Sequence, residues 1–210
     1  MTNPSEKAYF ERFEQLFSLM DAAWARTAEA FGFVCRGCGE NCCETLFYHH
    51  THMEQDYLLY GAGQMEQDVI ARVLDRALNV VSLSGRTDPG VSPPRIMCPL
   101  NENGQCILYR FRPMICRMHG IPHVLHRPGA EPLPGPGCRA GEPLFRKPHI
   151  PVFDRTPHYT AMAALEMDYR KAFGKTGKVR LTISQILISG IGRLACKLPR
   201  KYGETEGMDI

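Results

Sequence analysis

Cysteines are the residues of this chain whose type and spacing could do chemistry, and there are nine of them. The densest group contains Cys35, Cys38, Cys42 and Cys43. A Cys-x-x-Cys pair in a tight turn can direct two thiolate sulfurs at one metal ion, and glycines beside Cys38 give such a turn its backbone freedom. Because Cys42 and Cys43 are adjacent, we expect either that one binds metal while the other packs, or that they serve two ions.

Four further cysteines lie in segments rich in glycine, proline and asparagine: Cys98, Cys106, Cys116 and Cys138. Core cysteines usually stand singly in apolar periodic segments, so this placement favours metal ligands. Disulfides are the weaker alternative, because the count is odd and no export signal is visible. Cys196 stands apart on a C-terminal apolar segment, where we expect a buried structural thiol.

Thiolate donors of this kind suit zinc and iron, and the sequence leaves the choice open. The eight clustered thiols could form two zinc sites, or one iron–sulfur cluster such as a 4Fe–4S centre with spare ligands. Zinc requires only the sulfurs, whereas a redox cluster usually needs an electron route or a second substrate, and no motif indicates one.

Two arginines are candidate cofactor-binding residues. Arg112 and Arg117 lie on either side of Cys116 in the sequence. Four thiolates around a divalent ion leave a net charge of about −2, so nearby guanidinium groups could offset that charge or hold an anionic substrate. Salt bridges to local carboxylates are the alternative interpretation.

Several histidines lie close to the cysteines in sequence. His49 and His52 would share one face of a predicted helix, whereas His50 would point about 100° away from His49. We expect partly buried helix residues here rather than metal ligands. His119 and His123 flank a short turn and are weaker ligand candidates.

Four linked motifs resemble a known family. They are Cys-x2-Cys-x3-Cys-Cys from residue 35, Cys-Pro-Leu from residue 98, Gly-Gln-Cys-Ile-Leu-Tyr from residue 104 and Arg-Pro-Met-Ile-Cys-Arg from residue 112. In order and spacing they resemble the YkgJ-type cysteine-cluster family, which is described as a zinc- or iron-chelating domain related to the flagellin lysine N-methylase. The resemblance covers about residues 35–138, roughly half of the chain.

The resemblance implies a chelating set and singles out Arg112, Pro113 and Arg117 beside it. The implied ligands are Cys35, Cys38, Cys42, Cys43, Cys98, Cys106, Cys116 and a late cysteine such as Cys138. His119 belongs to a departure from the family, which tends to place an apolar or aromatic pair after Arg117. His119 is therefore either an added ligand or a surface substitution.

The elements that must position these residues follow from hydrophobic periodicity and from glycine and proline. Predicted helices cover residues 4–32, 44–60, 64–83, 159–173 and 182–198, and a small hairpin lies near Cys98–Tyr109. Residues 126–151 contain seven prolines and are predicted to form a long loop, which a bond from Cys138 to metal would hold in place.

We expect a mainly α fold in a single domain, 1–210, with helices packed around an irregular, turn-rich cysteine core and a small β-hairpin. Within that domain the metal-binding core covers 35–138 and basic C-terminal helices cover 158–200. Hydrophobic residues make up 44% and charged residues 22% of the chain, enough for a core without help from a metal.

Charge and composition narrow the classes of function. The net charge of +3 is too small to indicate nucleic-acid binding by itself, although residues 170–201 contain nine basic residues and no acidic one. A polar N-terminus and the lack of a long apolar segment predict a cytoplasmic protein without a membrane span.

Three functions remain open at the level of sequence. The first is a metal-chelating protein whose ion serves a structural site, metal handling or a protein partner. The second is an iron–sulfur enzyme that modifies a protein side chain, as the resemblance to a methylase implies. The third is a nucleic-acid or partner binder with structural zinc, whose affinity for nucleic acid would fall with salt.

Overall fold

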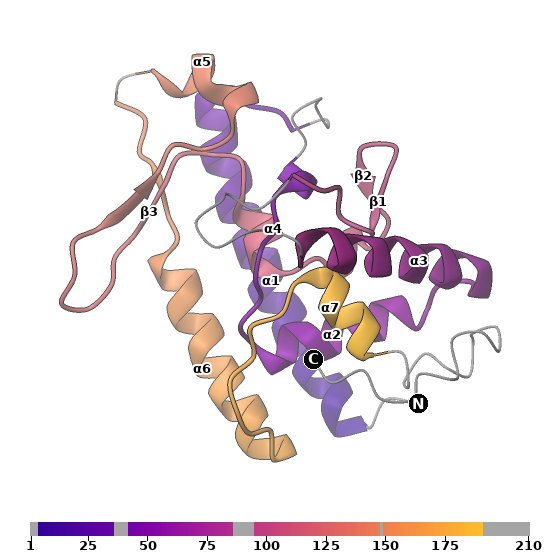
Figure 1. Ribbon diagram of the computed structural model, residues 1–210. Coiled ribbons are helices and arrows are strands. Elements are labelled where there is room, and N and C mark those ends of the chain that lie inside the picture. The colour runs from indigo at the N-terminus through magenta and orange to yellow at the C-terminus, as the bar shows by residue number, and fades with distance from the viewer. Residues whose placement is uncertain (1–3, 36–41, 86–94, 148, 191–210) are drawn as a thin grey trace. The chain divides into compact units, whose positions relative to one another are not determined.

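The computed structural model describes residues 4–35, 42–85, 95–147 and 149–190, and it is mainly helical with a small antiparallel hairpin, as expected. The chain forms two compact units, each built from two stretches of sequence. Unit 1 comprises Met1–Cys42 and Pro113–Gly177, and unit 2 comprises Cys43–Arg112 and Lys178–Ile210. Figure 1 shows the elements of both units.

Unit 1 begins with a long helix, α1 (Pro4–Phe31), as its hydrophobic period predicts. One face of this helix carries buried apolar side chains, namely Phe10, Phe13, Phe17, Met20, Ala28 and Phe31. The helix ends where Gly32 adopts a left-handed φ of +71°, which glycine accepts without strain. The helix predicted over 4–32 is therefore confirmed.

Two helices of unit 1 pack against α1, namely α4 (Met114–Met118) and α6 (Thr156–Phe173). Tyr169 on α6 is buried, and its ring meets that of Tyr9 edge-on with 5.6 Å between the centroids. The Tyr169 hydroxyl also donates to Glu6 Oε1 at 3.1 Å. The predicted helix ending at Phe173 is confirmed, with a start slightly earlier than expected.

The proline-rich segment 126–151 contains more regular structure than its sequence indicates. β4 (Leu133–Gly135) pairs antiparallel with β3 (His123–Leu125), and β5 (Phe153–Asp154) pairs parallel with the other edge of β3. Two helical turns, η3 (Arg139–Gly141) and α5 (Glu142–Phe145), follow β4. The predicted long loop is wrong, because strand pairing orders the segment. The ligand role of Cys138 is a separate prediction.

The described helices of unit 2 are α2 (His52–Ala62), α3 (Gln67–Ser84) and α7 (Ile183–Ser189). α7 packs against both α2 and α3. The helix predicted over 64–83 corresponds to α3 and is confirmed. The helix predicted over 44–60 is wrong at its start, because the helix begins only at His52.

The late start of α2 has a physical cause. Thr51 caps the helix, since its Oγ1 accepts a hydrogen bond from Glu54 N at 3.2 Å. Just before the cap, His49 N donates to Leu181 O at 2.8 Å and Leu181 N donates to His49 O at 3.1 Å. Such antiparallel pairing requires extended backbone, which excludes a helix at His49. Earlier still, the chain forms only a 3-10 turn, η1 (Cys42–Glu44).

The predicted hairpin forms in unit 2, where β1 (Asn101–Glu102) pairs antiparallel with β2 (Gln105–Cys106). Asn103 and Gly104 make the two-residue turn with φ values of 52° and 83°, because an Asn-Gly pair tolerates the positive φ that such turns require. The strand ends at Cys106, and a 3-10 turn, η2 (Tyr109–Phe111), replaces the strand expected up to Tyr109.

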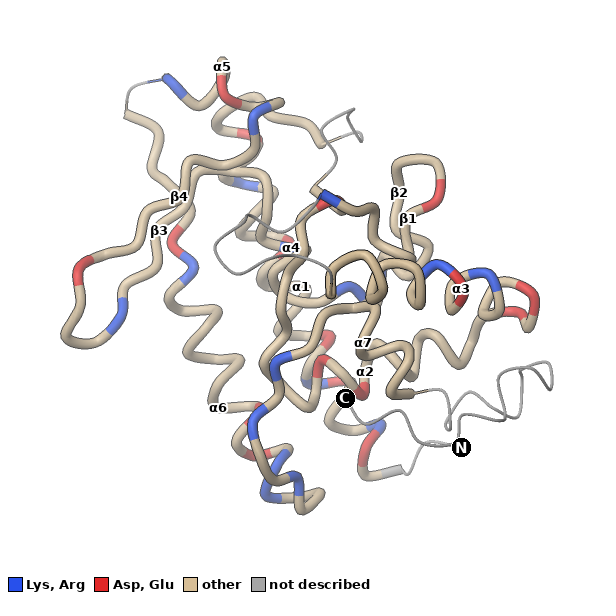
Figure 2. Tube along the Cα trace, viewed as in Figure 1, with Lys and Arg blue, Asp and Glu red and all other residues tan. Residues whose placement is uncertain are grey.

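The last described helix, α7, begins with a capping box, in which the Thr182 and Gln185 side chains each accept the other residue's backbone N–H. The remainder of the helix predicted over 182–198 lies outside the described residues, as does Cys196. Figure 2 shows basic residues, coloured blue along the backbone, at the C-terminal end of α6, where Arg170 Nη2 donates to Gly177 O at 2.9 Å. None of the described helices is long and apolar enough to cross a membrane.

A methyl group added at Gly61 on α2 should destabilise unit 2. A Cβ there would overlap ring atoms of Phe111, whereas a Cβ at Gly85 would come no closer than 3.4 Å to another heavy atom. Overpacking of this kind costs about 1–3 kcal/mol, so Gly61→Ala should lower the free energy of unfolding in urea by that amount. Gly85→Ala is the matched control and should change it by less than about 0.5 kcal/mol. Equal effects would contradict the close packing of α2 against η2.

Candidate metal centre

The structure describes every cysteine of the predicted chelating set except Cys38. The described cysteines carry thiols rather than disulfides, and only Cys35 among them is exposed. Unit 1 contains Cys35, Cys42, Cys116 and Cys138, and unit 2 contains Cys43, Cys98 and Cys106. The predicted core over 35–138 thus contributes to both units, and the single domain over 1–210 stays a prediction.

Backbone hydrogen bonds link the three segments of unit 2 that carry cysteines. Cys98 N donates to Cys43 O at 2.8 Å, which joins the η1 turn to the segment before β1. Asn101 N donates to Cys98 O at 3.0 Å, and Asn101 lies opposite Cys106 in the hairpin. The hairpin therefore returns the chain to the neighbourhood of Cys98. We call Cys43, Cys98 and Cys106 the unit 2 thiol group.

The thiols of this group interact electrostatically. The pKa of the Cys98 thiol is raised to about 12, mainly by burial and further by repulsion between a Cys98 thiolate and the thiolate forms of Cys106 and Cys43. A hydrogen bond from the Leu100 backbone and the positive charge of Arg76 act in the opposite direction. Cys98 therefore keeps its proton at neutral pH, and a metal ion that binds this sulfur must displace that proton.

Arg76 on α3 is a positive charge beside this group that sequence reasoning missed. Its Nη2 donates to Glu102 Oε1 at 2.9 Å, and its buried Nε has no hydrogen-bond partner among the described atoms. A thiolate sulfur can accept such an N–H, which places Arg76 among the residues able to offset the charge of a metal–sulfur site. No signal marks Arg76 in the sequence, because it stands in an ordinary amphipathic helix.

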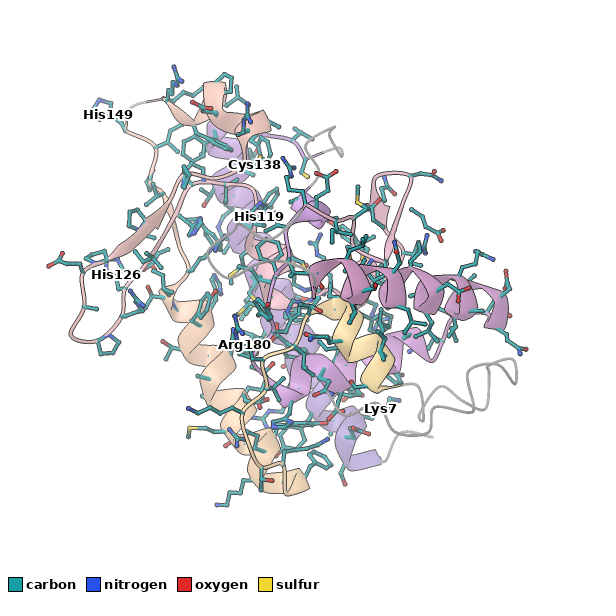
Figure 3. All side chains as sticks on the ribbon, in the orientation of Figure 1. Lys7, His119, His126, Cys138, His149 and Arg180 are labelled. Carbon is teal, nitrogen blue, oxygen red and sulfur yellow. The ribbon has the colours of Figure 1, made fainter. Side chains whose placement is uncertain are left out.

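The cysteines of unit 1 lie on separate elements. Cys116 lies on α4, and Cys138 immediately precedes η3 and is labelled in Figure 3. Cys138 N donates to Gly120 O at 3.0 Å, which ties its segment to the turn that follows α4. Within the part of the chain that the structure describes, no group of three or more His, Cys, Asp or Glu side chains is arranged to hold a metal ion. The metal centre itself stays a prediction.

The two candidate arginines have aromatic and acidic neighbours. Arg117 is 6% exposed, its Nη1 lies 2.6 Å from Asp21 Oδ2, and its guanidinium stacks 3.8 Å from the centroid of the Phe17 ring. The guanidinium of Arg112 lies 3.7 Å from the centroid of the Tyr109 ring. The contacts of Arg117 favour the salt-bridge interpretation for that residue, and a cofactor-binding role for either arginine stays a prediction.

His49 is placed differently from the sequence prediction. It does not share a helix face with His52, because its backbone pairs with Leu181 and its side chain is 2% exposed. Burial, and then the charge of His50, lowers the pKa of His49 to about 4. Its buried Nε2 has no hydrogen-bond partner among the described residues. His49 is therefore a neutral core residue at neutral pH.

Comparison with known proteins was made at the level of family, sequence and structure. No protein-family model, no curated protein and no solved structure matches this chain. The resemblance to the YkgJ-type family stays a prediction that depends on the four sequence motifs alone.

The buried His49 should make the protein less stable in acid. The unfolded chain takes up a proton on this side chain below its ordinary pKa of 6.5, whereas the folded protein resists protonation until about pH 4. Stability should therefore fall as pH drops from 6.5 towards 4, by up to about 3 kcal/mol from this residue.

Urea unfolding at several pH values measures this effect. His49→Gln should flatten the slope between pH 4 and 6.5, whereas His50→Gln at the exposed neighbouring position should leave most of it. His119, whose pKa is also lowered to about 4, chiefly by burial, supplies a remaining slope in both variants. An unchanged slope in His49→Gln would show that His49 is not buried in its neutral form.

Removing the partner of Arg117 should destabilise unit 1. Asp21→Asn leaves a buried guanidinium without its anion, and since Asp21 is partly exposed we expect a loss of about 2 kcal/mol rather than the full cost of a broken buried pair. Asp168→Asn is the matched control, because its ion pair with Arg12 is exposed and contributes about 0–1 kcal/mol. Urea titration compares the two variants, and an equal loss in both would argue against a structural role of the Arg117–Asp21 pair.

Proposed function

We propose that this chain binds zinc or iron through cysteine thiolates, and that the unit 2 thiol group is one of its binding sites. The observation that carries the proposal is the backbone pairing that joins the segments of Cys43, Cys98 and Cys106, together with the electrostatic interaction of the Cys98 thiol with the other two. A hydrophobic core gains little from grouping ionisable side chains, whereas a soft metal ion gains several ligands at once.

The chemistry of this donor set fits such an ion. Sulfur donors suit zinc and iron, and a further thiol, a water or another anion would complete a tetrahedral site. A bound ion would cross-link three segments, namely η1, the segment that precedes β1, and strand β2. The free energy of metal binding would then stabilise the folded state of the protein. The protein itself contributes the backbone bond from Cys98 to Cys43 and the guanidinium of Arg76, which offsets negative charge.

The cysteines of unit 1 make up the second part of the proposal. Cys42 and Cys43 belong to different units, which supports the interpretation that these adjacent thiols serve two ions. The second site would draw its ligands from Cys35, Cys38, Cys42, Cys116 and Cys138. The backbone bond from Cys138 to the turn after α4 supports the nearness of Cys116 and Cys138.

Replacing Cys98 with serine should remove the metal of unit 2 and spare that of unit 1. Serine keeps the shape of the side chain but is a poor ligand for a soft ion, so metal content should fall to about half of wild type. Cys116→Ser should remove the other half, and the double variant should bind none. Elemental analysis of anaerobically purified protein measures these contents.

Cys196→Ala serves as the control, because this cysteine lies outside the proposed ligand set and its loss should leave metal content unchanged. Unchanged content in Cys98→Ser would exclude the unit 2 site. The same preparations separate the candidate ions, since an iron–sulfur cluster absorbs visible light and gives a brown protein, whereas zinc is colourless. A brown protein would support the iron–sulfur enzyme interpretation.

A further inference from the structure

Arg155 in unit 1 is a buried positive charge that no carboxylate balances within the described residues. It precedes α6 and is 5% exposed. Its Nη2 donates to Met118 O, and its Nε has no hydrogen-bond partner among the atoms that the structure describes. Loss of hydration around a guanidinium is costly unless an opposite charge compensates it. Arg117, by contrast, meets the carboxylate of Asp21.

Three other side chains able to hydrogen-bond lie within electrostatic reach of Arg155, namely Tyr159, His119 and His123. Tyr159 lies one turn along α6, where its N donates to Arg155 O at 3.1 Å. His119, labelled in Figure 3, follows α4, and its carbonyl oxygen accepts from Trp24 Nε1 at 2.8 Å. All of these residues belong to unit 1.

Protonation would make both ring nitrogens of each of these two histidines hydrogen-bond donors. Burial first, and then the charge of Arg155, lowers the pKa of His119 to about 4 and lowers the pKa of His123 as well. His123 Nδ1 lies 3.2 Å from Ile121 O, so in the neutral ring this nitrogen carries the proton and Nε2 carries a lone pair. An anion beside them would reverse the repulsion from Arg155 and favour a proton on each ring.

We propose that Arg155, Tyr159, His119 and His123 form a binding site for a phosphate-type oxyanion. The guanidinium provides a planar fork of N–H donors that matches two oxygens of one anion. His123 is only partly buried, so part of this residue is in contact with solvent.

A phosphate group fits this donor set better than a carboxylate does. A carboxylate carries one negative charge, which the guanidinium alone balances, and it would leave both histidines neutral. A phosphate group carries about −1.5 to −2 at neutral pH, so it can also draw protons onto the imidazoles. Binding of phosphate with proton uptake is therefore the signature of this site.

Isothermal titration of the full chain with inorganic phosphate at constant ionic strength tests the proposal. In buffers of different ionisation heat, wild type should show saturable binding with uptake of protons. Arg155→Met should weaken binding at least about tenfold, since it removes a charge-assisted pair of hydrogen bonds. Arg127→Gln, at an exposed arginine of unit 1, is the matched control and should bind as wild type does.

Two further experiments allow for an unfolded variant and for binding of phosphate to a metal ion. If circular dichroism shows that Arg155→Met is unfolded, Arg155→Lys and His123→Gln take its place, and both should weaken phosphate binding. The titration is repeated on chelator-treated protein, in which phosphate should bind as before. Two results for phosphate would overturn the proposal: no saturable binding to wild type, or binding to Arg155→Met as tight as to wild type. It would also be overturned if acetate bound as tightly as phosphate without proton uptake, or if removal of metal by the chelator abolished phosphate binding.

Discussion

Removing an ionisable group from water is costly unless an opposite charge or a proton compensates it, and this constraint governs the polar interior of both units. The protein meets it in different ways at different residues. Arg117 finds the carboxylate of Asp21, His49 stays neutral, and Cys98 keeps its proton among neighbouring thiols. Arg155 donates to Met118 O, but alone of these four it is a buried charge with no opposite charge to balance it among the described residues. Cys98 and Arg155 are therefore the positions where an external ion would change the energetics most.

Local sequence patterns predicted a large part of the fold. The apolar stripe of α1 needs only its own helical period and a terminating glycine, and both are contiguous in sequence. The Asn103–Gly104 turn is likewise decided by two residues whose backbones accept positive φ. These predictions agree with the structure because no contact with a distant part of the chain favours a different backbone conformation at these residues. The same holds for the cysteine turn around Cys98, whose proline and glycine neighbours exclude long regular elements.

Features set by distant contacts escaped sequence reasoning. The helix predicted before His52 does not form, because backbone pairing with Leu181, far along the chain, holds His49 in an extended conformation. The proline-rich segment gains a strand because β3 supplies backbone partners to residues 133–135. Among the site residues, the cysteines could be named from spacing, but their division between the two units and the approach of Arg76 to Cys98 depend on tertiary structure.

The interleaving of the two units has a consequence for how the chain is made. The apolar face of α1 packs against α4 and α6, which belong to the second stretch of unit 1 and leave the ribosome only after residues 43–112 have emerged. Until then α1 has none of these partners and exposes several phenylalanine side chains, a state that invites chaperone binding or aggregation during translation. Unit 2 in turn awaits α7, which leaves the ribosome only after residues 113–177 of unit 1 have emerged. Neither unit can be obtained by cutting the gene at one point.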